Sequence, residues 1–357
     1  MHWDLFCRVV DNLGDIGFCW RLAAELAARG EQVRLWLDEP APLAWMAPGG
    51  ARNVTVGRWA EACGATTPAD IAIETFGCGL PEPYILRMAQ RTRPPLWIDL
   101  EYLSAESYVE RSHGLPSPRT DVAGRGLTMW FYYPGFSVAT GGLLREADLA
   151  DRRRRYSRTD WLRSIGVDSA AALRDDTRIV SLFCYDNPAL PDLLDTLSDA
   201  PTLLLATAGH AAQQARRELG PDLERGALKV HVLPRLSQLD YDHLLWASDL
   251  NFVRGEDSFV RAQWAGAPFI WQIYPQHDRA HIVKLEAFLD LFLHGAAPAP
   301  AREIRQLFAA WNGAGAWPAL PDPRAWRRHC ATWRTELCAQ TDLCTRLLAY
   351  AGAGLLK

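Results

Sequence analysis

The chain has 357 residues, of which 22% are charged, and a formal net charge of −4. This is an ordinary soluble composition, and the length suits about two domains. Without a basic excess, nucleic acid is excluded as the main ligand. No apolar run approaches the length needed to cross a bilayer, and the opening residues His2, Trp3 and Asp4 do not resemble a signal peptide. We therefore expect a cytoplasmic protein with no membrane partner.

The first hundred residues predict a parallel sheet with helices packed against it. A strand is expected at 5–10, a tight loop at 11–17, a helix at 18–29 and a second strand at 32–37. Parallel strands joined by a helix imply a right-handed crossover, which is typical of a Rossmann-like sheet. The further strands expected in this half are at 70–75 and 96–100, with one hairpin arm at 127–133.

A charged stretch at 146–160 precedes a second alternation of strands and helices. It contains the basic run Arg152–Arg155, whose acidic neighbours indicate a solvated, self-neutralised face. The strands of the second half are expected at 178–185, 202–206, 228–232, 250–253 and 268–273. The helices are expected at 190–197, 213–219, 241–247 and 259–265, with a Trp-rich helical stretch at 325–351. This order is again that of an α/β domain with a parallel sheet.

We therefore predict two Rossmann-like domains, at 1–168 and 169–340, and a C-terminal helix at 341–357 that packs back on the first domain. Ligands of such sheets bind beyond the carboxyl ends of the strands. The polar loops at 11–17 and 254–258 both follow strands, so both are expected to line one cleft between the domains.

The eight cysteines include no CxxC pair, and the spacing of Cys330, Cys338 and Cys344 matches no zinc-ligand pattern. Most of the cysteines lie among apolar neighbours. We therefore expect buried free thiols and no metal site.

The segment from Arg254 to Ser258 is the strongest ligand-binding pattern in the chain. It leads from a strand into a helix that Asp257 or Ser258 can cap. The N–H groups at the start of a helix bind anions, and Arg254 adds a planar cationic fork. This arrangement suits a diphosphate, and Glu256 could bind a hydroxyl of ribose or of a sugar. The alternative is a helix cap with a surface ion pair.

Two carboxylates, Asp11 and Asp15, share the loop at 11–17. Its glycines do not form the GxGxxG fingerprint of a dinucleotide site, which argues against an NAD-dependent oxidoreductase. Paired carboxylates suit a cationic substrate, or a general base with a raised pKa. The alternative is that Asp11 forms a turn and Asp15 caps a helix.

Phe183 and Tyr185 lie two residues apart at the end of an expected strand. Both rings should therefore share one face, where they could sandwich a planar base. Gln238 and Tyr241 could complete that pocket. The alternative is that these rings belong to the core.

Two long motifs resemble those of the bacterial protein-arginine rhamnosyltransferase family, EarP. One is Asp-Asn-Leu-Gly-Asp-Ile-Gly-Phe-Cys-Trp-Arg-Leu-Ala at 11–23. The other is Asn-Phe-Val-Arg-Gly-Glu-Asp-Ser-Phe-Val-Arg-Ala-Gln-Trp-Ala-Gly at 251–266, followed by Pro-Phe-Ile-Trp-Gln-Ile-Tyr-Pro-Gln. Shorter similar segments lie at 100–106 and 134–146. The resemblance extends from about residue 5 to 295, and the segment after residue 300 carries no matching motif.

The resemblance implies an α/β protein of the GT-B fold, in which two Rossmann-like domains face an interdomain cleft and a C-terminal helix crosses back. It also implies an inverting glycosyltransferase that moves L-rhamnose from dTDP-β-L-rhamnose to an arginine of translation elongation factor P, without a metal or another cofactor. The domain at 1–168 would bind the acceptor, and the domain at 169–340 would bind the nucleotide sugar.

Site roles follow from the same resemblance. Asp15 would be the general base, Asp11 would orient the guanidinium, and Glu256 would support the donor and the active site. The residues implied in donor binding are Phe183, Tyr185, Gln238, Tyr241, Phe252, Arg254, Asp257 and Ser258.

The chemistry of the residues agrees with these roles. An arginine guanidinium has a pKa far above neutral, so a carboxylate is better suited to accept its proton as the new bond forms than to deprotonate it beforehand. Arg254 and the helix N-terminus could stabilise the leaving diphosphate. Two alternatives stay open: a GT-B transferase with another nucleotide-sugar donor or a non-protein acceptor, and a non-catalytic nucleotide-binding regulator.

Overall fold

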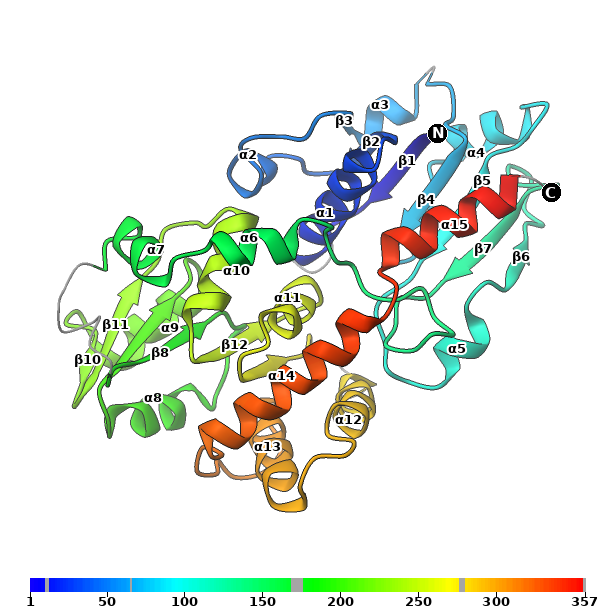
Figure 1. Ribbon diagram of the computed structural model, residues 1–357. Helices are drawn as coiled ribbons and strands as arrows, with labels where there is room; N and C mark the ends of the chain where they lie inside the picture. The colour runs from blue at the N-terminus through cyan, green and yellow to red at the C-terminus, as the bar shows by residue number, and fades with distance from the viewer. Residues whose placement is uncertain (10–12, 65, 168–175, 276–279, 356–357) are drawn as a thin grey trace. The chain divides into compact units, whose positions relative to one another are not determined.

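The computed structural model describes residues 1–9, 13–64, 66–167, 176–275 and 280–355 (Figure 1). The chain forms two compact units, one made of 1–149 with 338–357 and the other of 150–337. The first unit thus ends before residue 168, and the charged stretch at 150–160 begins the second unit.

A seven-stranded sheet forms the centre of the first unit, in the order β3-β2-β1-β4-β5-β7-β6. Neighbouring strands pair in parallel except β6 and β7, which are antiparallel. The strands are β1 (His2–Cys7), β2 (Gln32–Leu37), β3 (Val54–Arg58), β4 (Ile71–Thr75), β5 (Leu96–Leu100), β6 (Pro116–Pro118) and β7 (Thr128–Tyr132). The helices are α1 (Gly14–Ala28), α2 (Leu43–Met46), α3 (Trp59–Ala62), α4 (Glu82–Ala89), α5 (Tyr108–Ser112) and α15 (Leu343–Leu355).

Along each strand the side chains alternate between the two faces of this sheet. A hydrophobic core covers each face. On β1, Trp3 and Leu5 belong to the core on the side of α1, whereas Phe6 belongs to the core on the side of α3 and α4. The C-terminal helix α15 adds its buried residues to the α1 side, namely Leu343, Cys344, Leu347 and Ala351. The last segment of the chain is therefore part of the first unit (Figure 1).

The helical stretch expected at 325–351 is not continuous. It divides into α14 (Pro323–Ala339) and α15, with a break at 340–342. The Asp342 carboxylate accepts a hydrogen bond from the backbone N–H of Thr345 at 3.0 Å, so a side chain marks the start of the second helix. The C-terminal helix expected at 341–357 corresponds to α15, and the helical stretch expected at 325–351 is interrupted by this break.

The first strand also lies earlier than expected, at His2–Cys7 rather than 5–10, and α1 begins at Gly14 rather than 18. The polar residue Asp4 lies inside β1 and is completely buried. A buried carboxylate is tolerated only where donors satisfy it. Sequence alone does not show those donors, which come from residues distant in the chain.

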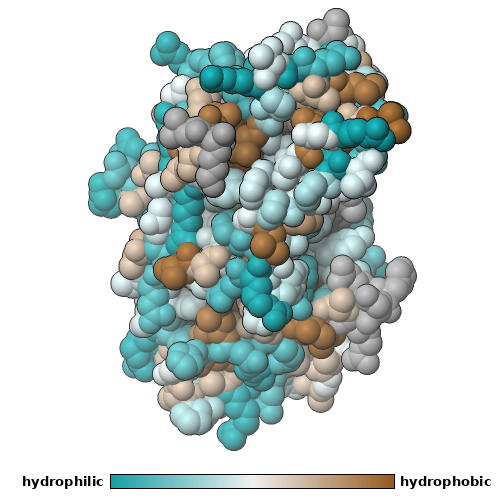
Figure 2. All heavy atoms as spheres, turned by 90° about the vertical axis from the view of Figure 1, so that its right-hand side faces the viewer, coloured by the Kyte–Doolittle hydropathy of each residue, from teal (hydrophilic) through white to brown (hydrophobic). Residues whose placement is uncertain are grey.

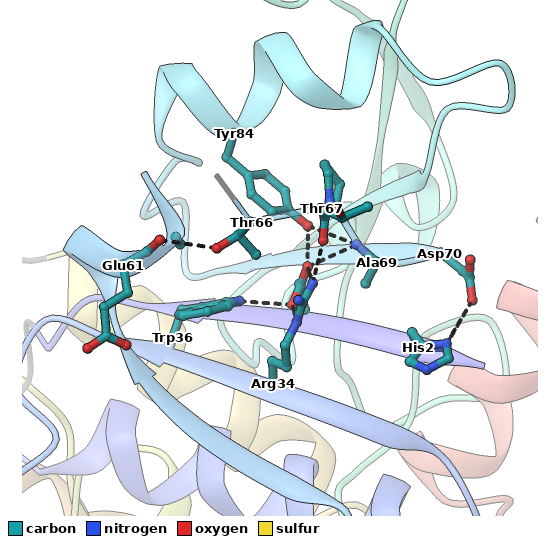
Figure 3. A network of polar contacts seen from close by, with 12 residues as sticks. His2, Arg34, Trp36, Glu61, Thr66, Thr67, Ala69, Asp70 and Tyr84 are labelled. Carbon is teal, nitrogen blue, oxygen red and sulfur yellow. Dashed lines mark hydrogen bonds and ion pairs between the residues drawn. The ribbon is translucent and has the colours of Figure 1, made fainter. Parts of the chain in front are cut away.

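Four residues donate to the Asp4 carboxylate. Arg34 donates through Nε and Nη2, both at 2.6 Å, Trp36 through its indole N–H at 2.9 Å, and Ala69 through its backbone N–H at 3.0 Å. The hydroxyl of Tyr84 donates as well. Figure 3 shows these side chains converging from neighbouring strands and α4. The network joins β1, β2 and α4 at the amino-terminal end of β1.

A six-stranded sheet forms the centre of the second unit, in the order β10-β11-β9-β8-β12-β13, with only the β10–β11 pair antiparallel. The strands are β8 (Arg178–Leu182), β9 (Thr202–Ala206), β10 (Glu224–Arg225), β11 (Leu228–Val232), β12 (Leu250–Arg254) and β13 (Phe269–Gln272). Besides α14, the helices are α6 (Leu149–Arg155), α7 (Arg158–Ser164), α8 (Leu190–Ser198), α9 (His210–Leu219), α10 (Gln238–Ala247), α11 (Asp257–Ala265), α12 (Ala280–Phe292) and α13 (Pro298–Trp311). The predicted pair of parallel α/β sheets is confirmed.

No helix in the described part of the chain is both long and apolar enough to cross a membrane. On the face shown in Figure 2, hydrophobic residues are scattered among hydrophilic ones.

Candidate functional site

The predicted diphosphate loop lies where β12 meets α11. Arg254 is the last residue of β12, and Gly255 makes the turn with φ = 62°, in the left-handed region that favours glycine. The carbonyl of Gly255 accepts a hydrogen bond from the indole N–H of Trp271 at 2.8 Å. The turn is thereby fixed to β13.

The expected cap of α11 by Asp257 or Ser258 was wrong. Glu256 occupies the N-cap position, and its side chain makes no cap hydrogen bond. The Ser258 hydroxyl folds back instead, accepting from the Arg254 backbone N–H at 3.2 Å and donating to the Arg254 carbonyl. Since Ser258 lies inside the first turn, it ties that turn to the strand rather than closing the helix end.

The Arg254 guanidinium lies between two aromatic rings. Its Cζ is 4.5 Å from the ring centroid of Phe183 and 4.4 Å from that of Tyr185, within cation–π distance. Arg254 is 9% exposed, and its Nη1 has no hydrogen-bond partner among the described residues. A buried cationic N–H group without an acceptor is unfavourable. The position therefore favours an anion that supplies acceptors.

Two further rings extend this cluster. Tyr241 of α10 meets Phe183 edge-on with centroids 5.5 Å apart, and Tyr274 meets Tyr185 at 5.4 Å. Within the described residues, the buried Tyr241 hydroxyl has no hydrogen-bond partner. Burial raises the pKa of Tyr241. The nearby Ser258 hydroxyl lowers that pKa by a smaller amount, although it forms no hydrogen bond with the Tyr241 hydroxyl. Aromatic faces beside a cation and a neutral hydroxyl can hold a planar, polar ring.

Phe252 lies in the core rather than on this surface. It is 0% exposed, and its ring packs on Trp311 with centroids 4.6 Å apart. Its carbonyl accepts from the Phe183 backbone N–H at 2.9 Å. The structure thus gives Phe252 a supporting position under the aromatic cluster.

Gln238, Glu256 and Asp257 all lie at the starts of helices. Gln238 is the first residue of α10, 8% exposed, and one turn before Tyr241. Glu256 and Asp257 begin α11 and are partly exposed. Asp257 is close enough to Tyr241 to contribute to its raised pKa. These residues therefore surround the same end of the second sheet as Arg254.

A buried ion cluster joins α10 to α11. Arg261 of α11 donates through Nε and Nη2 to the two oxygens of Asp242 in α10, at 2.8 and 2.7 Å. Arg152 of α6 donates to the same carboxylate at 2.9 Å. Arg261 and Asp242 are 2% and 1% exposed, so their bidentate pairing holds the two site-bearing helices in place.

The basic run at 152–155 is the solvated face that its sequence indicates only at Arg154 and Arg155, which are exposed. Arg152 belongs to the buried ion cluster, and Arg153 donates to the carbonyls of Trp264 and Ala265 at the end of α11. Their acceptors are distant in sequence, which is why the interpretation was wrong for these two residues. Arg154 pairs with its near neighbour Asp151, and Arg155 donates to the Asp151 backbone carbonyl.

In the first unit, Asp15 lies in the first turn of α1 and is 3% exposed. The N-cap of α1 is Leu13, so Asp15 is an internal helix residue and not its cap. Burial raises the pKa of the neighbouring Cys19 thiol, and the charge of Asp15 adds to the rise. Asp11 lies outside the described residues.

A second pair of buried carboxylates was not predicted. Glu74 and Asp99 are register partners on β4 and β5, and 4% and 5% exposed. Burial, followed by the charge of Asp99, raises the pKa of Glu74 to about 8. Burial, followed by the charge of Glu101, raises the pKa of Asp99 to about 7. A sequence signal existed, because each acid occupies the fourth position of an otherwise mostly apolar strand.

Comparison with known proteins places these features in a family. The family model described as "Elongation-Factor P (EF-P) rhamnosyltransferase EarP" matches residues 3–352. A protein-arginine rhamnosyltransferase of Pseudomonas aeruginosa is 44% identical over 376 residues, covering 98% of both chains. One from Pseudomonas putida is 42% identical, with 98% of both chains covered.

Solved structures give the same result. A structure described as showing the basis of EarP-mediated arginine glycosylation of EF-P matches with a TM-score of 0.66 and 33% identity, over 98% of both chains. The glycosyltransferase VinC in complex with dTDP has a TM-score of 0.54 at 14% identity, covering 99% of both chains, and shows a shared fold alone. The predicted GT-B fold and the prediction of a glycosyltransferase are confirmed. The chain belongs to the EF-P rhamnosyltransferase family, EarP.

Proposed function

We propose that the protein transfers L-rhamnose from dTDP-β-L-rhamnose to an arginine side chain of elongation factor P, with inversion and without a metal, in the cytoplasm. Family membership supports the reaction class. The observation that carries the donor assignment is Arg254, a nearly buried guanidinium held between two rings at the start of α11, with one nitrogen that has no partner among the described residues.

The diphosphate of the donor would bind at Arg254 and the first turn of α11. A diphosphate supplies the acceptors that the Arg254 Nη1 lacks, and the positive end of the helix adds to the attraction. As the glycosidic bond breaks, negative charge grows on the leaving phosphate. Donors already fixed in place stabilise that charge without reorganisation. Arg254 and the helix end would therefore stabilise the negative charge that a metal ion stabilises in other glycosyltransferases.

The thymine would lie among the rings beside Arg254. Phe183, Tyr185 and Tyr241 offer aromatic faces, and the Tyr241 hydroxyl is an unused hydrogen-bonding group within the described residues. Gln238, one turn from Tyr241, carries an amide that can both donate and accept, as a pyrimidine edge requires. Recognition of the base would thus come from α10 and the end of β8.

Asp15 would serve as the general base. Its carboxylate is nearly buried in the first turn of α1. A charged carboxylate can hold the acceptor guanidinium and take a proton as its nitrogen attacks the anomeric carbon. The C–N bond forms while the bond from that carbon to the diphosphate oxygen breaks, which gives inversion.

Intact-mass spectrometry of elongation factor P, incubated with the protein and dTDP-β-L-rhamnose, tests the reaction. We expect a gain of one deoxyhexose with the wild type. Asp15→Asn, which keeps the size of the side chain but removes its basicity, should be slower by roughly 10²–10⁴-fold. Absence of the gain with the wild type would refute the acceptor.

Calorimetric titration with dTDP, UDP and GDP tests the donor separately. We expect dTDP to bind tightest to the wild type and to Asp15→Asn alike, since Asp15 lies in the other unit from the donor residues. Tighter binding of UDP or GDP would refute the choice of donor while leaving the diphosphate site intact.

A further inference from the structure

Pairing between β8 and β12 ends beside Arg254. The Phe183 N–H donates to the Phe252 carbonyl at 2.9 Å, as the parallel register of the two strands requires. In a continued ladder the Tyr185 N–H would donate to the Arg254 carbonyl. Ser258 occupies both backbone groups of Arg254 instead, because its hydroxyl accepts from the N–H at 3.2 Å and donates to the carbonyl. The segment after β8 therefore needs other partners for its backbone.

A buried glutamine of β13 supplies the first of these partners. Gln272 is the register partner of Arg254, so its side chain starts beside the end of β12. Its Oε1 accepts from the Tyr185 N–H at 2.9 Å, and its Nε2 donates to the Asp186 carbonyl at 3.4 Å. The side chain thus takes the place of the backbone acceptor that β12 does not offer to Tyr185.

A second buried glutamine holds the same segment from α9. Gln214 donates through Nε2 to the Tyr185 carbonyl at 3.0 Å, and its Oε1 accepts from the Asn187 N–H at 2.8 Å. The Asn187 side chain in turn donates to the Trp311 carbonyl at 2.9 Å. Both backbone groups of Tyr185 are therefore bonded to side-chain amides, the N–H to Gln272 and the carbonyl to Gln214. We refer to these two glutamines as the glutamine clamp.

The clamp fixes where the Tyr185 ring lies. That ring is one of the two that enclose the Arg254 guanidinium, and it follows the end of β8. Buried polar groups that are fully hydrogen-bonded rigidify the structure around them. Gln214 and Gln272 are 1% and 6% exposed, and both ends of each amide bond within the protein, so they act on the site through Tyr185 rather than by binding the donor.

We propose that the glutamine clamp is a positioning device for donor binding. It holds the Tyr185 ring against Arg254, so that the guanidinium is oriented before the diphosphate arrives. A site that is already ordered binds more tightly, because its ligand does not have to order it. Neither glutamine is among the residues that the family resemblance implies in donor binding. The inference rests on the proposed function, because it concerns the donor of that reaction.

A double-mutant cycle on dTDP binding tests the clamp. Dissociation constants for dTDP are measured by calorimetry for the wild type, Gln272→Met, Tyr185→Leu and the double variant. Methionine keeps the length of glutamine but makes neither hydrogen bond, and leucine keeps apolar bulk without a ring. We expect Gln272→Met to weaken dTDP binding by roughly three- to tenfold in the wild-type background. With Tyr185→Leu present, the further loss should be less than about two-fold, because the clamp then has no ring to position.

A matched control separates positioning from general packing. Gln263 of α11 is as buried as Gln214, but its side chain accepts from the Trp333 indole N–H at 2.8 Å. Gln263→Met should lower stability to urea as Gln272→Met does, while its dTDP affinity stays within about two-fold of the wild type. Gln214→Met should reproduce the loss of affinity and its dependence on Tyr185. Should Gln272→Met not fold, Gln214→Met completes the same cycle.

Equal losses with and without the Tyr185 ring, or a Gln263→Met variant that binds dTDP as weakly as Gln272→Met, would overturn the proposal. Wild-type dTDP affinity in a clamp variant that unfolds cooperatively in urea would do the same. If the wild type binds dTDP and adds deoxyhexose to elongation factor P while the cycle is additive, the clamp is refuted and the proposed function stands. If the wild type binds no dTDP, the donor assignment fails, and the clamp proposal fails with it.

Discussion

Replacing Glu74 by glutamine should stabilise the protein at alkaline pH and change little at acid pH. The pKa of Glu74 rises from an ordinary 4.5 to about 8, first because it is buried and then because Asp99 lies beside it. Between these two values, the native state holds a proton that the unfolded chain has released. The free energy of unfolding therefore falls as the pH rises through this window, and it stays low above it.

The size of the effect follows from the shift. A rise from 4.5 to about 8 corresponds to an upper bound of roughly 5 kcal/mol lost above pH 8. Glu74 and Asp99 interact, so part of that loss belongs to the pair rather than to Glu74 alone. We expect glutamine to recover about 2–4 kcal/mol, since its amide stays neutral and can donate to the Asp99 oxygen that lacks a partner within the described chain.

Urea unfolding of wild type and Glu74→Gln at about pH 5 and about pH 9 measures this difference. The two proteins should be similarly stable at the lower pH, and the variant should be clearly more stable at the higher. Asp99→Asn is the matched control and should give a gain of the same sign, because the pKa of Asp99 also rises, to about 7. A stability difference that is constant across pH would refute the reasoning.

Three further substitutions test other parts of the structure. Arg254→Lys should weaken dTDP binding about tenfold or more in calorimetry, because an ammonium cannot lie flat between two rings or bind phosphate in bidentate fashion; unchanged affinity would contradict the proposed diphosphate site. Asp4→Asn should lower the free energy of unfolding by about 3–5 kcal/mol, since it leaves Arg34 without its charged partner; a loss under about 1 kcal/mol would show that the network is dispensable. Asp242→Asn should cost a similar amount in urea unfolding by leaving Arg261 buried and uncompensated, and a neutral result would contradict its structural role.

Most of the fold could be predicted because the elements that build it are local patterns. The apolar strands and the helices between them recur with clear periodicity, and their parallel order follows from the crossovers. The misplaced elements depend on distant partners. β1 lies earlier in the chain than expected, because the buried Asp4 within it accepts hydrogen bonds from residues such as Tyr84, which is far along the chain. No element was expected at α13, which begins with prolines that a helix tolerates only in its first turn.

The candidate site was predictable as far as its residue types, but not as far as its contacts. Arg254, Phe183 and Tyr185 could be chosen from the sequence, yet the stacking of the guanidinium between both rings depends on β8 and β12 pairing side by side. The position of Phe252 in the core likewise follows from α13. Gln214 gave no signal, because its bonds to the segment after β8 join residues that are distant in the sequence.

The charges around α11 explain why this helix is suited to a leaving anion. At its carboxyl end, Arg153 and Arg334 donate to the carbonyls of Trp264 and Ala265, so the negative end of the dipole is compensated. At its amino end the N-cap residue Glu256 makes no side-chain cap hydrogen bond, and Arg254 adds a positive charge beside the acidic residues Glu256 and Asp257. The backbone N–H groups at such an end can bind an anion. In the proposed reaction the diphosphate becomes more negative as its bond to the sugar breaks, so this end of α11 would bind the transition state and products more strongly than the ground state, which is the condition for it to accelerate the reaction.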